Sequence, residues 1–238
     1  MILDFCPGGD LGKIIAQERR FTEERAKLYI AEILLALQDL HKRDIIYRDL
    51  KPDNVVLDND GHALLTDFGL SKEGVLEVNK GAKSFCGSIA YLAPEMLRRV
   101  GHGKSVDWYL LGVLLYEMIA GIDPFNDDDP MAIYQNILRG KIRFPRKFDR
   151  DARSLVKHLL QSDLSRRYGN LKNAAQDVKN HRFFDIINWK LLHKKGVVPP
   201  YKPSVKSESD TSNFGYYSSS DEYLVPPVKE NKDPFLKW

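Results

Sequence analysis

The stretch Ile46-Tyr47-Arg48-Asp49-Leu50-Lys51-Pro52-Asp53-Asn54 is followed, thirteen residues later, by Asp67-Phe68-Gly69, and these two motifs decide the fold of the chain. Short apolar runs at 55–57 and 63–66 flank Asn59-Asp60-Gly61, which is typical of a hairpin turn. The second run leads directly into Asp67, so the hairpin and the acidic turn are mechanically linked. Asp, Asn, Pro and Gly are also ordinary turn residues, but the two motifs in this order favour a functional site over plain turn chemistry.

The residue types in these motifs match the requirements of phosphoryl transfer. Such a reaction needs a carboxylate that takes the hydroxyl proton, a cation near the transferring phosphate and two oxygen ligands for Mg²⁺. We expect Asp49 to be the catalytic base and Lys51 to be the cation near the γ-phosphate. Asn54 and Asp67 are the expected metal ligands. The expected cofactors are therefore ATP and Mg²⁺.

Size and composition describe an ordinary globular chain. Its 238 residues, of which 43% are hydrophobic, can bury a core, and the length suggests one domain or one domain with a tail. The net charge of +3, from 36 basic and 33 acidic residues, provides no one-signed field that would indicate nucleic acid or a membrane as the main partner. Cys6 and Cys86 lack metal-type spacing and are interpreted as free thiols, so we expect the cytoplasm or the nucleus.

Helical periodicity dominates the middle of the chain. Thr22 is expected to cap a long helix whose apolar residues recur at helical spacing: Ala26, Ile30, Ile33, Leu34, Leu37 and Leu40. An apolar helix is predicted over 105–120, and its apolar run at 109–119 is too short to span a bilayer. The end of a strand is predicted at 1–5, and a short helix is predicted to begin near residue 10. Three weaker helical patterns complete the prediction. The weaker patterns lie at 130–138, 151–160 and 171–179.

The composition changes from about Lys194 onward. Six of the 12 prolines lie in residues 199–238, with serines at 218–220 among them. Such a segment cannot form a core of its own. We expect an extended tail that is either disordered or wrapped over the domain.

With these motifs the chain resembles a eukaryotic serine/threonine protein kinase of the AGC group, which includes the cAMP-dependent kinase. Three features resemble that group: Tyr47 before Arg-Asp, the run Phe85-Cys86-Gly87-Ser88, and the tail stretch Asp-Thr-Ser-Asn-Phe at 210–214. Residues 67–75 look like the growth-factor-regulated branch. Residues 164–180 and the tail look like the cAMP-dependent branch, and both alternatives stay open.

The resemblance implies a protein-kinase-like fold that is α+β but mainly α, namely a C-terminal lobe with small β-hairpins. We expect the end of a small-lobe strand and the hinge at 1–9, the large lobe at 10–184 and an AGC-type tail at 185–238. The implied catalytic loop is 47–54 and the activation segment is 67–95. The sequence contains no Gly-rich loop, strand lysine or helix glutamate of a small lobe. Most of the N-terminal lobe is therefore expected to be missing, and the chain as given could not clamp ATP in the usual way.

By the same resemblance, one group of residues would surround the nucleotide. Val56 would form the floor beneath adenine, Asp10 would reach the ribose and Phe214 would close the pocket from the tail. Simple packing is the alternative for Val56 and Phe214. The full expected set is Leu3, Asp4, Cys6, Asp10, Val56, Thr66 and Phe214.

Ser84 resembles an activation-loop phosphorylation site, with Arg48 and Lys72 as the phosphate ligands. A phosphoserine adds a charge of about −1.5 to −2 and three acceptor oxygens, which can order a loop against an arginine. An upstream activating kinase is therefore an implied partner, and the sequence does not identify a regulatory subunit. One exposed serine among many is the alternative interpretation.

Carboxylates also occupy the positions at which related kinases bind arginines that precede the target residue. These are Asp10, Asp53 and Glu117, and Ser88 is a further expected substrate contact. Carboxylates bind arginine through paired, charge-assisted hydrogen bonds. The expected partners are protein or peptide substrates with basic residues, and solvated surface acids are the alternative.

Five residues are expected to support the geometry: Tyr47, Phe68, Glu95, Asp107 and Arg167. Glu95 and Arg167 would form an ion pair that anchors the activation segment, and Asp107 would hold the backbone of the catalytic loop. The competing hypothesis for the whole chain is a truncated kinase or pseudokinase module that captures basic peptides without phosphoryl transfer. The complete catalytic set argues against it, because folding alone does not require those residues.

Overall fold

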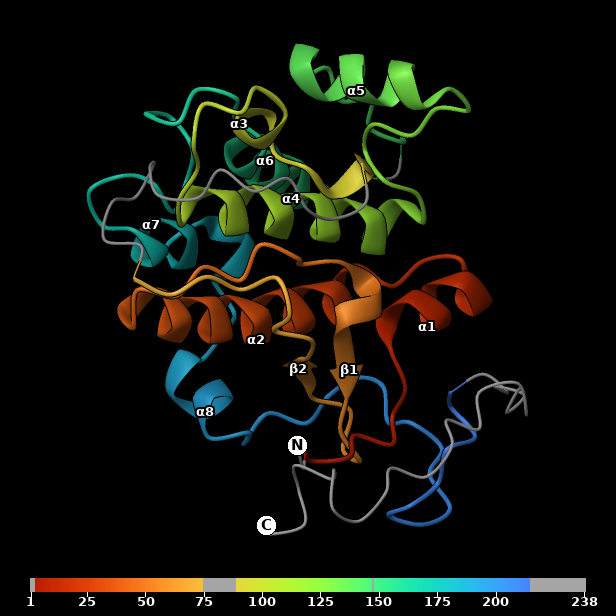
Figure 1. The fold of residues 1–238 in the computed structure, drawn as a ribbon. Helices are drawn as coiled ribbons and strands as arrows, with labels where there is room; N and C mark the ends of the chain where they lie inside the picture. The colour runs from red at the N-terminus through yellow and green to blue at the C-terminus, as the bar shows by residue number, and fades with distance from the viewer. Residues whose placement is uncertain (1–2, 75–88, 147, 215–238) are drawn as a thin grey trace, which may run out of the picture.

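The computed structural model describes residues 3–74, 89–146 and 148–214. Its centre is a pair of stacked helices, α2 (Glu23–Lys42) and α4 (Ser105–Ala120), with α6 (Arg150–Leu159) packed on the far side of α4. A two-stranded sheet lies against α2, and Figure 1 shows it on the side of α2 that faces away from α4. The described part is therefore mainly helical with one small hairpin, as the sequence predicts.

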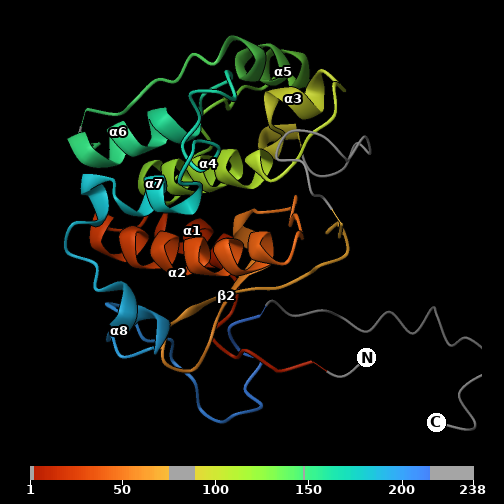
Figure 2. The same cartoon turned by 90° about the vertical axis from the view of Figure 1, so that its left-hand side faces the viewer.

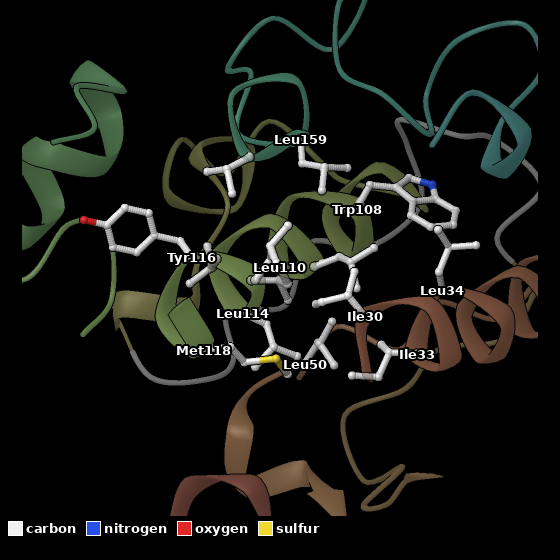
Figure 3. Close-up of a cluster of buried hydrophobic side chains, with 14 of the residues drawn as sticks. Ile30, Ile33, Leu34, Leu50, Trp108, Leu110, Leu114, Tyr116, Met118 and Leu159 are labelled. Carbon is white, nitrogen blue, oxygen red and sulfur yellow. The ribbon is translucent and has the colours of Figure 1, made fainter. Parts of the chain in front are cut away.

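Helix α4 has the bounds that its sequence predicts, because it is apolar on all sides and a helix of this kind is stable only inside a core. Ile30, Ile33 and Leu34 of α2 face Leu110, Leu114 and Met118 of α4 in the buried cluster of Figure 3. Gly112 allows α6 to approach, since a Cβ atom there would lie 2.7 Å from Leu159 Cβ. This packing fixes the helix that supports the catalytic loop.

Helix α2 begins at the predicted cap. The hydroxyl of Thr22 accepts the backbone N–H of Arg25 at 3.4 Å, and Glu23 and Glu24 occupy the positive end of the helix dipole. Its buried residues recur at helical spacing along the side that faces α4. The predicted long helix is confirmed.

The hairpin consists of β1 (Val55–Leu57) and β2 (Ala63–Leu65), which pair antiparallel with Val56 opposite Leu64. Gly61 supplies the positive φ of +92° in the turn. Glu32 of α2 holds the start of β2: its carboxylate accepts the backbone N–H of Ala63 at 2.8 Å and lies 2.5 Å from Nδ1 of His62. The strand that leads into Asp67 is thereby fixed to the helical core.

The remaining elements surround this centre in short segments. They are α1 (Leu11–Glu18), α3 (Pro94–Leu97), α5 (Pro130–Arg139), α7 (Ala175–Lys179), α8 (Trp189–His193) and the 3-10 turns Pro52–Asn54, Ile89–Tyr91 and Arg182–Phe184. Among the described residues, no helix combines the length and the apolarity needed to span a bilayer.

Two sequence-based predictions of secondary structure were wrong. The helix expected at 171–179 covers only Ala175–Lys179, because Ala174 has a positive φ of +48° and the Asn173 side chain bonds Asp177 instead of continuing a helix. The described residues of the expected strand end, 3–5, are in no strand.

The described part of the tail wraps over the domain. Lys195 Nζ lies 2.6 Å from Asp58 of the hairpin turn, and Asn213 Nδ2 donates to Pro7 O at 2.9 Å. The ring of Tyr201 lies 3.7 Å from the guanidinium carbon of Arg25. Of the two alternatives for the tail, residues 194–214 follow the wrapped one.

Candidate active site

The loop at 47–54, the expected catalytic loop, brings Asp49, Lys51 and Asn54 together. Lys51 Nζ lies 3.0 Å from Asp49 Oδ2, and Asn54 Nδ2 donates to the same oxygen at 2.8 Å. Asn54 Nδ2 also donates to the backbone carbonyl of Asp49 at 2.8 Å. Asp49 is only 4% exposed, so this carboxylate is held in one orientation with a cation beside it.

Helix α4 fixes the backbone of this loop through the buried carboxylate of Asp107. Its Oδ2 accepts the N–H of Tyr47 at 3.0 Å, and its Oδ1 accepts the N–H of Arg48 at 2.8 Å. His41 Nε2 lies 2.7 Å from Oδ2. Arg48 adopts a positive φ of +68°, which a residue with a side chain rarely takes, and these hydrogen bonds stabilise it.

The acidic turn lies beside the loop. Thr66 N donates to Asn54 O at 3.0 Å, which places Asp67 next to Asn54. Asp67 Oδ1 accepts the N–H of Gly69 at 3.0 Å, and the hydroxyl of Tyr47 donates to the carbonyl of Thr66. The Phe68 ring contacts the Tyr47 ring edge-on at 5.4 Å between centroids. Loop and turn therefore form one unit.

The donors in this unit fit a magnesium ion. Mg²⁺ prefers oxygen ligands, usually one or two carboxylates with substrate phosphates. Asn54 turns its nitrogen to Asp49, so its side-chain oxygen is the atom that can bind a cation. Asp67 uses Oδ1 for the N–H of Gly69 and can offer Oδ2.

The residues expected around a nucleotide are only partly assembled. Asp10 and Val56 form a backbone bridge, and Phe214 lies against Phe5 with 5.8 Å between ring centroids. Asp10 Oδ1 caps α1 by accepting the N–H of Lys13 at 2.8 Å. Of the other expected residues, Leu3 and Asp4 are exposed, and Cys6 is half-buried. Burial, aided by the charge of Asp58, raises the pKa of the Cys6 thiol.

The expected phosphate ligands, Arg48 and Lys72, lie on two neighbouring backbone segments that are joined by an isolated β-bridge. Ile46 and Lys72 exchange two backbone hydrogen bonds of 2.9 Å, and Arg48 Nε donates to Leu70 O at 2.6 Å. Ser84 and Ser88 lie outside the described residues. Sequence reasoning missed His102 here: it is 3% exposed, its Nε2 has no hydrogen-bond partner among the described residues, and burial and the charges of Arg48 and Lys72 lower its pKa.

Of the expected substrate-binding carboxylates, Asp10 and Asp53 lie next to Gly12. Glu117 lies next to Tyr91. A Cβ atom at Gly12 would lie 3.0 Å from Asp53 Oδ1 and 3.2 Å from Asp10 Oδ1, so the two carboxylates face the same gap. The hydroxyl of Tyr91, which sequence reasoning also missed, donates to Glu117. Burial raises the pKa of Glu117 to about 7 against this hydrogen bond, and the charges of Asp123 and Asp53 add to the increase.

Glu95 and Arg167 form a bidentate ion pair, with N–O distances of 2.6 and 3.0 Å. Arg167 also donates to the carbonyls of Ser105 and Gln161 at 3.0 and 2.8 Å. Both side chains are almost fully buried, so each charge depends on the other. The pair joins α3, at the end of the expected activation segment, to the region after α6.

The fold and this site define a protein kinase large lobe. The family model described as "Protein kinase domain" matches residues 1–184, and the chain belongs to this family. Within the family it is similar to serine/threonine kinases of the AGC group, as the relatives below indicate.

Curated relatives cover nearly the whole chain. It is 45% identical over 235 residues to "cAMP-dependent protein kinase catalytic subunit" of Dictyostelium discoideum, covering 99% of this chain and 36% of the relative. It is 44% identical over 230 residues to "cAMP-dependent protein kinase catalytic subunit PRKX" of Homo sapiens, covering 97% of this chain and 63% of the relative. It is 48% identical over 237 residues to "Serine/threonine-protein kinase YPK1" of Saccharomyces cerevisiae, covering 96% of this chain and 34% of the relative. The chain thus spans between about a third and two thirds of these relatives.

Proposed function

We propose that the protein transfers the γ-phosphoryl group of ATP to serine or threonine in arginine-containing sequences, using Asp49 as the base. The proposal rests on one observation: the ammonium group of Lys51 and the side-chain amide of Asn54 both bind Oδ2 of the buried Asp49 carboxylate. Because Lys51 and Asn54 both bind Oδ2 of Asp49, its Oδ1 is the oxygen that can face a substrate hydroxyl. Phosphoryl transfer depends mainly on such positioning and on charge neutralisation.

The roles of the residues follow from this geometry. Asp49 orients the hydroxyl and accepts its proton, Lys51 neutralises charge on the transferring phosphate, and Asn54 holds the carboxylate of Asp49 in place. Asn54 and Asp67 are the residues that would hold Mg²⁺. When bound, the Mg²⁺–ATP complex supplies the phosphoryl group and neutralises the charge that develops on its oxygens.

The proposed preference for arginine rests on the acids beside the site. Asp10 and Asp53 face one gap, and Glu117 has its pKa raised partly by Asp53. An arginine entering among these carboxylates would form charge-assisted hydrogen bonds and relieve their mutual repulsion.

Activation by phosphorylation at Ser84 completes the proposal. It is supported by Arg48, which immediately precedes the base, and by Lys72, which is paired to the same strand of backbone. A phosphate bound to Arg48 would help to fix the position of Asp49, because the two residues are adjacent in the chain. An upstream kinase would supply the phosphate, and Ser84→Ala is expected to lower activity at least about tenfold.

The test uses the natural-length protein with peptides that carry arginines before the target serine, and matched peptides with alanine in their place. We expect transfer to the arginine peptides and its loss, by at least about a thousandfold, in Asp49→Asn. Asp44→Asn is the matched control, since Asp44 is a partly exposed acid paired with Lys104. Acidic or proline-directed peptides that outperform arginine peptides, or an active Asp49→Asn protein, would contradict the proposal.

A further inference from the structure

The charge of the chain is concentrated in one segment. Residues 139–157 contain eight basic and two acidic residues, a net charge of +6, while the whole chain carries +3. The other residues therefore sum to −3. The basic residues are Arg139, Lys141, Arg143, Arg146, Lys147, Arg150, Arg153 and Lys157, and the acids are Asp149 and Asp151.

An aromatic cluster anchors the middle of this segment. The rings of Tyr116, Phe144 and Phe148 contact one another, with centroid distances of 5.7 Å (Tyr116–Phe144), 5.1 Å (Phe144–Phe148) and 5.4 Å (Tyr116–Phe148). The hydroxyl of Tyr116 donates to the carbonyl of Arg143 at 2.5 Å. Phe144 is half-buried in this cluster, whereas the side chains of Lys141, Arg143 and Arg146 are exposed.

One face of α6 continues this charged surface. Arg150, Arg153 and Lys157 follow the three- and four-residue spacing of a single helix face. The charged ends of Arg153 and Lys157 lie 5.2 and 5.8 Å from the Phe144 ring, so this helix face adjoins residues 141–146. We call this surface the basic strip: Lys141, Arg143, Arg146, Arg150, Arg153 and Lys157. In both views the connection between α5 and α6 lies at the end of the molecule opposite α8 (Figures 1 and 2).

Among the described residues of the strip, only Arg150 pairs with one of the two local acids. Asp149 caps α6, accepting the N–H groups of Asp151 and Ala152 at 2.6 and 3.2 Å. Asp151 binds Arg182 at 2.9 Å and lies 3.7 Å from Arg150. Within the described ranges, Lys141, Arg143 and Arg146 have no carboxylate within ion-pair distance.

We propose that the basic strip binds a membrane surface rich in anionic phospholipids. A protein partner would need an apolar or aromatic centre in the interface. Of the large apolar side chains that are exposed in the described part, none lies in 139–157. An anionic bilayer requires only a row of accessible cations, each contributing about 1 kcal/mol, and such lipids are enriched on the cytoplasmic leaflet. The strip therefore fits a bilayer better than a protein.

The test measures co-sedimentation of the natural-length protein with phosphatidylcholine vesicles that contain or lack phosphatidylserine. We expect binding only with phosphatidylserine, and weaker binding as salt increases. The triple variant Lys141→Gln/Arg143→Gln/Arg146→Gln should bind about a hundredfold more weakly, from the loss of three such contributions. The matched control is Lys42→Gln/Lys172→Gln/Lys190→Gln, which removes the same charge from exposed lysines outside the strip.

Equal vesicle affinity of the two triple variants would overturn the proposal, as would equal binding to both kinds of vesicle. Tighter binding to duplex DNA or to poly-glutamate than to vesicles would overturn it in favour of those partners. Unchanged melting temperatures of both variants confirm that they fold. None of the strip residues belongs to the candidate active site, so this outcome is independent of the proposed phosphoryl transfer.

Discussion

Arg48 donates its backbone N–H to Asp107 across 59 residues of sequence, and this 2.8 Å bond fixes the backbone just before Asp49, the proposed base. Asp107 is fully buried and serves three donors, two of them backbone N–H groups. Helix α4, which is buried along most of its length, thus helps to position the backbone that carries Asp49. The geometry of the proposed reaction would thus depend on a buried residue outside the proposed catalytic set.

Asp107→Asn should destabilise the protein by roughly 2–4 kcal/mol, because the amide NH₂ group faces a donor and one buried N–H loses its acceptor. We expect kcat to fall as well, with a smaller change in the KM for peptide. The measurement is urea unfolding combined with steady-state kinetics. Asp44→Asn, which breaks a partly exposed ion pair with Lys104, should cost at most about 1 kcal/mol. Equal losses for the two variants would contradict this role of Asp107.

The elevated pKa of Glu117 predicts a pH-dependent preference for arginine. The folded protein keeps this carboxyl protonated below about pH 7, whereas the ordinary value is 4.5. Only the ionised form attracts a guanidinium group strongly. Lowering the pH from about 8 to about 6 should therefore raise the KM for arginine peptides more than the KM for alanine peptides.

Glu117→Gln is the variant that tests the assignment. It should weaken arginine binding and remove the extra pH dependence near pH 7. It should also stabilise the protein at neutral and higher pH. Because the pKa of Glu117 is raised in the folded state, its cost to folding grows as the pH rises from about 4.5 to about 7, remains above that, and is absent below about 4.5. Asp39→Gln is the exposed control and should change neither property. A persistent pH dependence in Glu117→Gln would assign the effect to another group.

Local patterns predicted most of the site, because its central residues are close in sequence. Asp49, Lys51 and Asn54 lie within six residues, and the bounds of α4 follow from one continuous apolar segment. The failures come from tertiary structure. No periodicity reveals that Ala174 adopts a positive φ, or that Asn213 reaches Pro7 across 206 residues.

The tail contact between Tyr201 and Arg25 is of this non-local kind, and it leads to a further prediction. The guanidinium of Arg25 lies between two rings, 4.2 Å from Phe21 and 3.7 Å from Tyr201. Tyr201→Ala removes one ring and should release the following tail residues, including Phe214. We expect faster hydrogen exchange over 202–214 and a several-fold higher KM for ATP, with little change in kcat. Tyr201→Phe retains the ring and should behave like the unmodified protein, and faster exchange in that variant would refute the ring contact as the cause.

Arg19 ends α1 in a conformation that suits glycine. Its φ is +70°, and its N–H still bonds the carbonyl of Ile15 at 2.7 Å. Its carbonyl oxygen is so close to Gly121 that a Cβ atom there would lie at 2.1 Å. The local backbone therefore cannot relax toward α4, and the strain of a side chain at positive φ remains.

Arg19→Gly should therefore stabilise the protein by roughly 0.5–1 kcal/mol, since relief of this strain exceeds the added entropy of the unfolded chain. The measurement is the midpoint of urea unfolding at constant m value. Arg20→Gly removes the same charge from a neighbouring residue that does not have a positive φ, so it should be neutral or destabilising. If both variants moved the midpoint upward by the same amount, the gain would come from the lost charge, and the backbone conformation of Arg19 would not be its cause.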